Sequence, residues 1–155
     1  MHERKVLLGL ALAVAVAACS DDNPAAPKPE TFAAAMNSAN EVGSAPYTSP
    51  ATGTATITVQ GNTLNWAIHT QGFEAGTTAP NGSTASLPAH IHIGGPTVSG
   101  SILANLGAKI NGDTAGTVTV VDSVLTHMRA GNSYVNIHTN HRGAGEIRGQ
   151  LAKVQ

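Results

Sequence analysis

Two histidines separated by one residue, His90 and His92, are the first candidates for chemistry in this chain. In a β-strand, residues two apart project from the same face, about 7 Å apart along the chain. Ile91 and Ile93 would then enter the core, which leaves both imidazoles side by side on the opposite face. Two imidazoles placed in this way can turn toward one ion at a nitrogen–metal distance of about 2.0–2.1 Å. The pair alone is a weak signal, because a hydrogen-bonded structural pair has the same spacing.

A third histidine, His138, ends another alternating segment, in which Val135 and Ile137 are the core candidates. His138 therefore shares the outer face with Asn136. His141 lies in the loop that follows and can reach the same patch. Imidazole ligands suit copper or zinc better than magnesium or calcium, which prefer oxygen ligands. The pattern predicts a copper or zinc site whose ligands are His90, His92, His138 and His141.

The next alternating segment sends Glu146 and Arg148 outward. A hairpin loop at 140–144 would place Glu146 opposite His138 and Arg148 opposite Asn136. Cross-strand neighbours of this kind lie about 4.5–5.5 Å apart at their Cβ atoms. Glu146 is then expected to accept the second ring N–H of His138, which is the usual outer support of a ligating histidine.

The same residues fit a second interpretation that needs no metal. In it, His138 bonds to Glu146 and Asn136, and Arg148 bonds to nearby carbonyl groups or pairs with Glu146. Such a polar network would fix the register of the strands and the loop. The spacing does not decide between the metal site and the network, so both stay open. The remaining domain histidines, His69 and His127, are predicted to be solvated.

The elements that position these residues are predicted to be strands. The chain is rich in Thr, Val, Ile, Ala and Gly, with turn signals about every ten residues, which indicates an all-β domain. We expect an antiparallel β-sandwich or Greek-key barrel, with loops at 74–87 and 94–100 as surface connections. Strands are expected at 31–37, 56–59, 64–68, 89–94, 101–106, 116–121, 133–139 and 145–152.

One short helix is expected at 123–130, capped by Asp122 or Ser123 and ended by Gly131.

Aromatic residues make up only 3% of the chain, so the core must be built from aliphatic side chains around Trp66. The length of 155 residues fits one domain. The formal net charge of −1 argues against a nucleic-acid partner, which normally requires a basic face.

The first residues have the pattern of an export signal. A basic start is followed by an apolar run at 6–18 and by small residues before Cys19, the only cysteine. The stretch 16–19 resembles a bacterial lipobox, which implies a signal peptide at 1–18 and a lipid anchor on Cys19. Ser20 then implies sorting to the outer membrane in a Gram-negative host. The Pro-rich stretch 20–30 is typical of an extended tether, so the folded domain is expected at 31–155. An ordinary secreted protein is the alternative.

Three stretches, AHIHIG at 89–94, YVNIHT at 134–139 and GEIRGQL at 145–151, resemble the CHRD domain. That domain is named from repeats in chordin and occurs singly in many bacterial exported proteins. NEV at 40–42 matches the start of the family, although Gly43 and Ser44 replace two prolines. The resemblance implies an antiparallel β-sandwich or barrel and no established reaction. It suggests a binding module with an envelope or extracellular protein as partner.

A weaker similarity is to copper–zinc superoxide dismutase, in which a His-x-His pair and a later histidine hold copper against the outside of a sheet. His90, His92 and His138 fit those roles, but the domain has no cysteine pair, no clear bridging histidine and no zinc subsite. The sequence therefore favours a lipid-anchored binding domain in the cell envelope that holds copper or zinc. A copper redox enzyme and a metal-free structural envelope module are the alternatives.

Overall fold

The computed structural model describes residues 28–43 and 47–155, in which one nine-stranded sheet and two short helices are found. The predicted signal peptide, Cys19 and most of the tether lie outside these residues. The strands are β1 (Glu30–Asn37), β2 (Thr52–Gln60), β3 (Thr63–Gln71), β4 (Leu87–Ile93), β5 (Ile102–Ala108), β6 (Asp113–Thr119), β7 (Ser133–Ile137), β8 (Ile147–Gln150) and β9 (Ala152–Lys153). The helices are the 3-10 turn η1 (Ser38–Asn40) and α1 (Asp122–Arg129).

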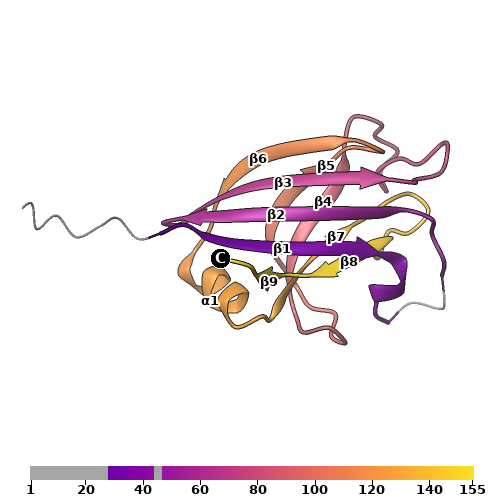
Figure 1. The fold of residues 1–155 in the computed structure, drawn as a ribbon. Helices are drawn as coiled ribbons and strands as arrows, with labels where there is room; N and C mark the ends of the chain where they lie inside the picture. The colour runs from indigo at the N-terminus through magenta and orange to yellow at the C-terminus, as the bar shows by residue number, and fades with distance from the viewer. Residues whose placement is uncertain (1–27, 44–46) are drawn as a thin grey trace, which may run out of the picture.

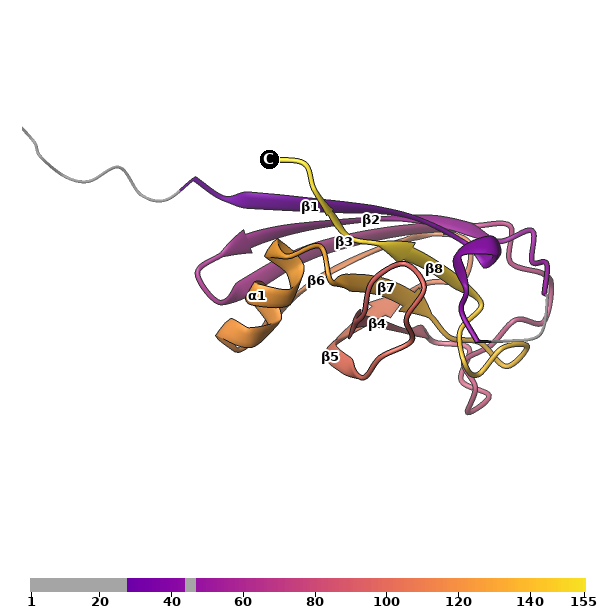
Figure 2. The same ribbon diagram turned by 90° about the horizontal axis from the view of Figure 1, so that it is seen from below.

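The sheet is antiparallel and curls almost into a barrel. Its strand order is β5-β4-β7-β8-β1-β2-β3-β6, and β9 pairs with β1. Strands β5 and β6 stand at the two ends of this order without forming a ladder, yet their Cα atoms approach within 8 Å. Figures 1 and 2 show β1, β2 and β3 in one layer, β4, β5 and β7 in the other, and α1 near one end. The predicted antiparallel all-β fold with one short α-helix is confirmed.

Alternation of small polar and aliphatic residues builds the strands. In β2, Ala55, Ile57 and Val59 are buried, whereas Thr54 and Thr56 are exposed. A hairpin follows, with β2 and β3 joined at 61–62 and paired from Thr52↔Gln71 to Gln60↔Thr63. Gly61 has φ +59°, a conformation that side-chain-bearing residues adopt rarely.

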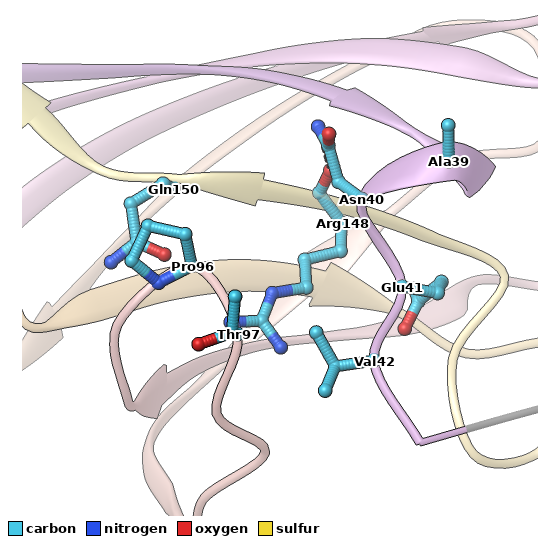
Figure 3. Close-up of a pocket in the computed structure, with 8 residues that line it drawn as sticks. All are labelled: Ala39, Asn40, Glu41, Val42, Pro96, Thr97, Arg148 and Gln150. Atoms are coloured by element: carbon cyan, nitrogen blue, oxygen red, sulfur yellow. Dashed lines mark hydrogen bonds between the residues drawn. The ribbon is translucent and has the colours of Figure 1, made fainter.

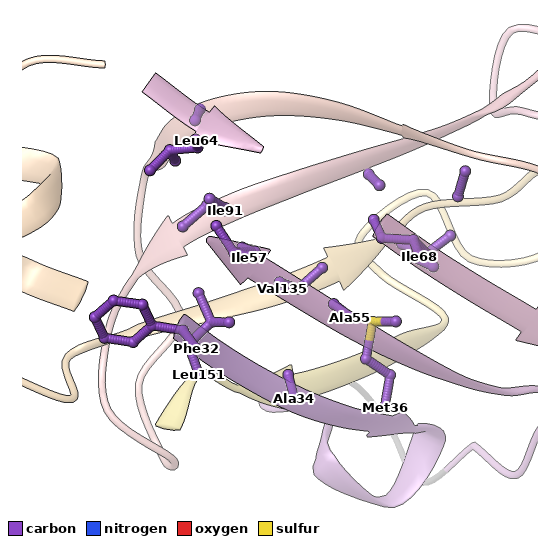
Figure 4. Packing of buried hydrophobic residues seen from close by; sticks show 14 of the residues in the cluster. Phe32, Ala34, Met36, Ala55, Ile57, Leu64, Ile68, Ile91, Val135 and Leu151 are labelled. Atoms are coloured by element: carbon purple, nitrogen blue, oxygen red, sulfur yellow. The ribbon is translucent and has the colours of Figure 1, made fainter. Parts of the chain in front are cut away.

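The core lies between the two layers and is aliphatic apart from Phe32 and Phe73. Figure 4 shows Ile57 and Leu64 from one layer facing Ile91 and Val135 from the other. All four side chains are fully buried, and each buried Ile or Leu contributes about 1.5–3 kcal/mol of transfer free energy.

The sequence predicted Trp66 at the centre of the core, and this prediction is wrong. Trp66 packs against the edge of the core and is partly exposed. Its ring lies over Gly116 of β6 and Gly107 of β5. A Cβ atom at Gly116 would come within 2.5 Å of the indole. Trp66 therefore fills the space where the two end strands approach, and glycines make room for it.

Helix α1 buries Val124, Leu125 and Met128 and is followed by Gly131, with φ +67°, as predicted. The predicted capping by Asp122 or Ser123 is wrong. The N-cap is Val121 without a side-chain bond, and the carboxylate of Asp122 accepts a 2.6 Å bond from Asn62 instead. Among the described residues, no helix combines the length and apolar character that a bilayer crossing requires.

Candidate metal centre

Three histidines from two paired strands meet at one point. His90 and His92 lie on β4, and His138 directly follows β7. The β4–β7 ladder places His90 opposite Asn136 and His92 opposite Tyr134, so all three rings leave the same side of the sheet. One ring nitrogen of each histidine lies within 4.8 Å of those of the other two. His90, His92 and His138, which strand alternation predicted on one face, therefore do lie together.

The orientation of His92 and His138 is set by backbone carbonyls. Nδ1 of His92 lies 2.9 Å from the carbonyl oxygen of Gly100, and Nδ1 of His138 lies 3.0 Å from that of Gly143. A carbonyl oxygen can only accept, so Nδ1 must carry the hydrogen in both rings. In a neutral imidazole the other nitrogen, Nε2, then has a free lone pair.

These two lone pairs face each other. The Nε2 atoms of His92 and His138 are 3.4 Å apart, and two acceptors this close require a proton or a metal ion between them. Two ligands at about 2.0–2.1 Å from a tetrahedral ion are themselves separated by about 3.3–3.4 Å. Nδ1 of His90 is also buried and has no hydrogen-bond partner. An ion among the three rings would satisfy the two Nε2 atoms and would lie within reach of one ring nitrogen of His90.

Burial keeps two of these rings in the neutral form that can bind a metal. It lowers the pKa of His90 to about 4, and the neighbouring His138 and His92 lower it further. Burial also lowers the pKa of His92, although the bond to Gly100 partly offsets this effect. At neutral pH, His90 and His92 therefore need lose no proton when a metal binds.

Behind His92, aromatic and cationic groups are stacked. The rings of His92 and Tyr134 are within 8° of parallel, with centroids 5.0 Å apart, and Cζ of Arg148 lies 3.4 Å from the Tyr134 centroid. Nη2 of Arg148 donates to the carbonyls of Gly95 at 2.7 Å and Val98 at 3.0 Å. Arg148 thus bonds to carbonyl groups, one of the predicted alternatives. The predicted ion pair with Glu146 is not formed.

The loop 94–100 covers this side of the sheet instead of serving only as a surface connection. The hydroxyl of Tyr134 accepts a bond from the Gly100 N–H. Beneath the loop, His92 is only 7% exposed and Arg148 only 2%. The prediction of a solvent-facing patch is therefore wrong on the His92 side, whereas His90 and His138 remain partly exposed.

A cavity of about 320 Å³ separates this loop from the segment after η1. Figure 3 shows Pro96 and Thr97 on one side of it, Glu41 and Val42 on the other, and the guanidinium of Arg148 between them. Burial raises the pKa of Glu41 to about 7, although the positive charge of Arg148 opposes this effect. No local pattern predicts this role of Glu41, because its contacts with Asn136 and Arg148 join distant segments.

Glu146 does not support His138, contrary to the prediction. Its side chain is buried and accepts bonds from Ser49 Oγ, at 2.6 Å, and from Thr139 Oγ1. The predicted pairing of Asn136 with Arg148 is found, but the ladder ends one pair later, at Ile137 and Ile147. Gly145, with φ +135°, turns the chain there, so the alternation does not extend to Glu146.

The other predicted site residues lie apart from the cluster. His141 is exposed and is not a member of the three-histidine group. Asn136 is buried and donates to Glu41 through a long 3.5 Å bond, so it does not contact His138 through its amide. His69 is exposed, as predicted, and its Nδ1 lies 2.8 Å from a carboxylate oxygen of Asp113.

Comparison with known proteins adds the family. The CHRD domain model matches residues 32–151, which include all three stretches that resemble it. No curated protein and no solved structure shows a significant match to the chain. Because the matched region runs from the first strand to the end of β8 and contains the clustered histidines, the chain belongs to the CHRD domain family.

Proposed function

We propose that this protein is an exported, lipid-anchored CHRD domain that binds one copper or zinc ion through His90, His92 and His138. The observation that carries the proposal is the pair of Nε2 atoms of His92 and His138, which face each other at 3.4 Å and carry no hydrogen when the rings are neutral, because Nδ1 holds it in both. Without an ion, the cluster must capture a proton or keep two lone pairs in contact. A metal ion removes this conflict, and one ring nitrogen of His90 is close enough to share that ion.

The type of ion follows from the donor atoms. Neutral imidazoles suit zinc and copper, whereas magnesium and calcium need several oxygen ligands. The three-histidine group contains no carboxylate and no thiolate. The carboxylate that was predicted beside it, Glu146, is engaged by Ser49 and Thr139. Copper and zinc are therefore the two candidate ions.

Metal analysis of the purified protein tests the proposal. After loading with zinc or copper and removal of free ion, we expect one equivalent in the wild type and a large loss in His92→Ala. His69→Ala is the matched control, because His69 belongs to an exposed pair with Asp113 outside the cluster, and it should retain one equivalent. Binding that is equal in the His92 and His69 variants would overturn the proposal. The metal-free network would then be the better interpretation.

The membrane anchor is proposed from the sequence before the described residues. A basic start, an apolar run and Cys19 support export with lipidation at that cysteine. Labelling of cells with a fatty-acid analogue should mark the wild-type protein and leave Cys19→Ser unlabelled. Equal labelling of both proteins, or of neither, would remove the anchor from the proposal and leave the metal site unaffected.

A further inference from the structure

We infer that the ion held by His90, His92 and His138 keeps one coordination position open to solvent, where a water molecule or a small anion binds. This inference rests on the proposed metal site. It gives the site an exogenous ligand, which distinguishes this site from metal sites that only stabilise a fold. Structural zinc sites use four protein ligands, whereas reactive sites use three and leave the fourth position to water or substrate.

The number of ligands is the first argument. Across residues 28–43 and 47–155, the group of side chains close enough to share an ion has three members. His141 and Glu146, which the sequence placed beside the cluster, do not supply a fourth ligand. His141 is exposed and outside the group, and the carboxylate of Glu146 is held by two hydroxyl donors. A four-coordinate ion would therefore lack one protein ligand.

The burial of the three rings shows which side is open. His92 lies under the loop 94–100, and the carbonyl oxygen of Gly100 in this loop accepts a hydrogen bond from Nδ1 of His92. His90 and His138 are partly exposed. The protein thus closes the site on the His92 side, and the free position of the ion faces solvent on the side of His90 and His138.

Charge decides what kind of ligand binds there. Three neutral imidazoles leave the full positive charge on the ion, and the cluster contains no carboxylate to offset it. The guanidinium of Arg148 lies behind His92 across the ring of Tyr134 and adds positive charge, which the neighbouring Glu41 offsets only as the pH rises through about 7. A cation in such a site attracts anions and makes a bound water more acidic. Small anions and water are therefore the expected ligands, and bulky or cationic groups are not.

Azide titration of the copper-loaded protein tests this inference. We expect a saturable change in the charge-transfer absorption and in the electron paramagnetic resonance spectrum, with one azide for each bound copper. If one copper binds but azide changes neither spectrum, the open position is wrong and the proposed metal site stands. If the wild type binds neither copper nor zinc, the metal site is wrong and the inference fails with it. The His92→Ala variant should show no azide response, and a response there would mean that azide reports copper bound elsewhere.

His141 provides the decisive variant, since the turn that carries it follows His138 directly. If the open position is free, His141→Ala should change the azide affinity by less than about twofold, as expected for residues that do not interact. If azide binds the His141→Ala protein much more tightly than the wild type, His141 fills the fourth position. That result would overturn the inference.

Discussion

His92 and His138 direct the same ring atom, Nε2, at each other across 3.4 Å, and each is held there by a carbonyl from a different loop. Each of these loops is in turn fixed by a buried residue from the 146–148 segment. Arg148 binds two carbonyls of the loop 94–100, which orients His92. Glu146 binds Thr139 at the start of the turn that supplies the Gly143 carbonyl to His138. Glu146 and Arg148 therefore act on the histidines through loops.

Replacement of Arg148 by lysine should destabilise the domain although it keeps the charge. Lysine cannot stack a flat cation on Tyr134 while reaching the carbonyls of Gly95 and Val98. We expect a loss of at least about 2 kcal/mol in the free energy of unfolding, measured with urea, because two hydrogen bonds from a charged donor are disturbed. Arg142→Lys is the matched control: Arg142 lies over the ring of Tyr47, where such a contact contributes about 0.5–1 kcal/mol. Equal effects of the two substitutions would contradict this role of Arg148.

Removal of the Thr139 hydroxyl should leave a buried oxygen of Glu146 without its donor. We expect Thr139→Val to cost about 1–3 kcal/mol in the free energy of unfolding. It should also weaken zinc binding about 10–100-fold if the turn at 139–145 orients His138, as is usual for groups that support a ligand. The matched control is Thr126→Val on the exposed surface of α1, which should change stability by less than about 0.5 kcal/mol. Unchanged zinc affinity in Thr139→Val would show that the turn does not position His138.

The hydroxyl of Tyr134 fixes the end of the loop that covers His92. Tyr134→Phe keeps a ring between His92 and the guanidinium of Arg148 but removes the acceptor for the Gly100 N–H. The expected cost is about 0.5–1.5 kcal/mol, with faster hydrogen exchange at the Gly100 amide. Exchange at the β2–β3 pairing should not change beyond the global loss of stability. If the Gly100 amide exchanges at the wild-type rate, the hydroxyl does not hold the loop.

Glu41 should make the domain less stable as the pH rises. Burial raises its pKa to about 7 from an ordinary value of 4.5, so the unfolded chain releases this proton at lower pH than the folded domain. The stabilisation is complete below about 4.5 and is lost as the pH rises through about 7. In the Glu41→Gln variant the side chain at this position stays neutral, so the free energy of unfolding should not fall in this way as the pH rises.

Urea unfolding at two pH values measures this effect. Relative to the wild type, Glu41→Gln should gain stability between pH 4.5 and pH 8, because only the wild type places a charge at this buried position at the higher pH. A difference between the two proteins that is the same at both pH values would show that the pKa of Glu41 is not raised.

Local patterns predicted much of the architecture. Alternation at 89–94 and 133–139 placed His90, His92 and His138 on one side of the sheet, and the same argument paired Asn136 with Arg148. These features depend only on the period of two in a strand and on the register of adjacent strands. The helix end at Gly131 was equally local.

The missed features depend on contacts between distant segments. Ser49 and Glu146, which are 97 positions apart, meet because β2 and β8, the strands that follow them, flank β1 in the sheet. The loop 94–100 looked like a surface connection because its Gly-rich composition gives no sign that Arg148 and Tyr134 hold it in place. Trp66 lies at the edge of the core because β5 and β6 approach each other beside its ring. Periodicity within single strands does not reveal this approach.

The central claim is that one ion lies among the three imidazoles, and anomalous diffraction measured at the absorption edge of zinc or copper tests it most directly. In crystals of the loaded protein we predict one strong peak about 2.0–2.1 Å from Nε2 of His92, from Nε2 of His138 and from a ring nitrogen of His90. A loaded crystal without a peak among these rings, or with its strongest peak at another position, would contradict the claim.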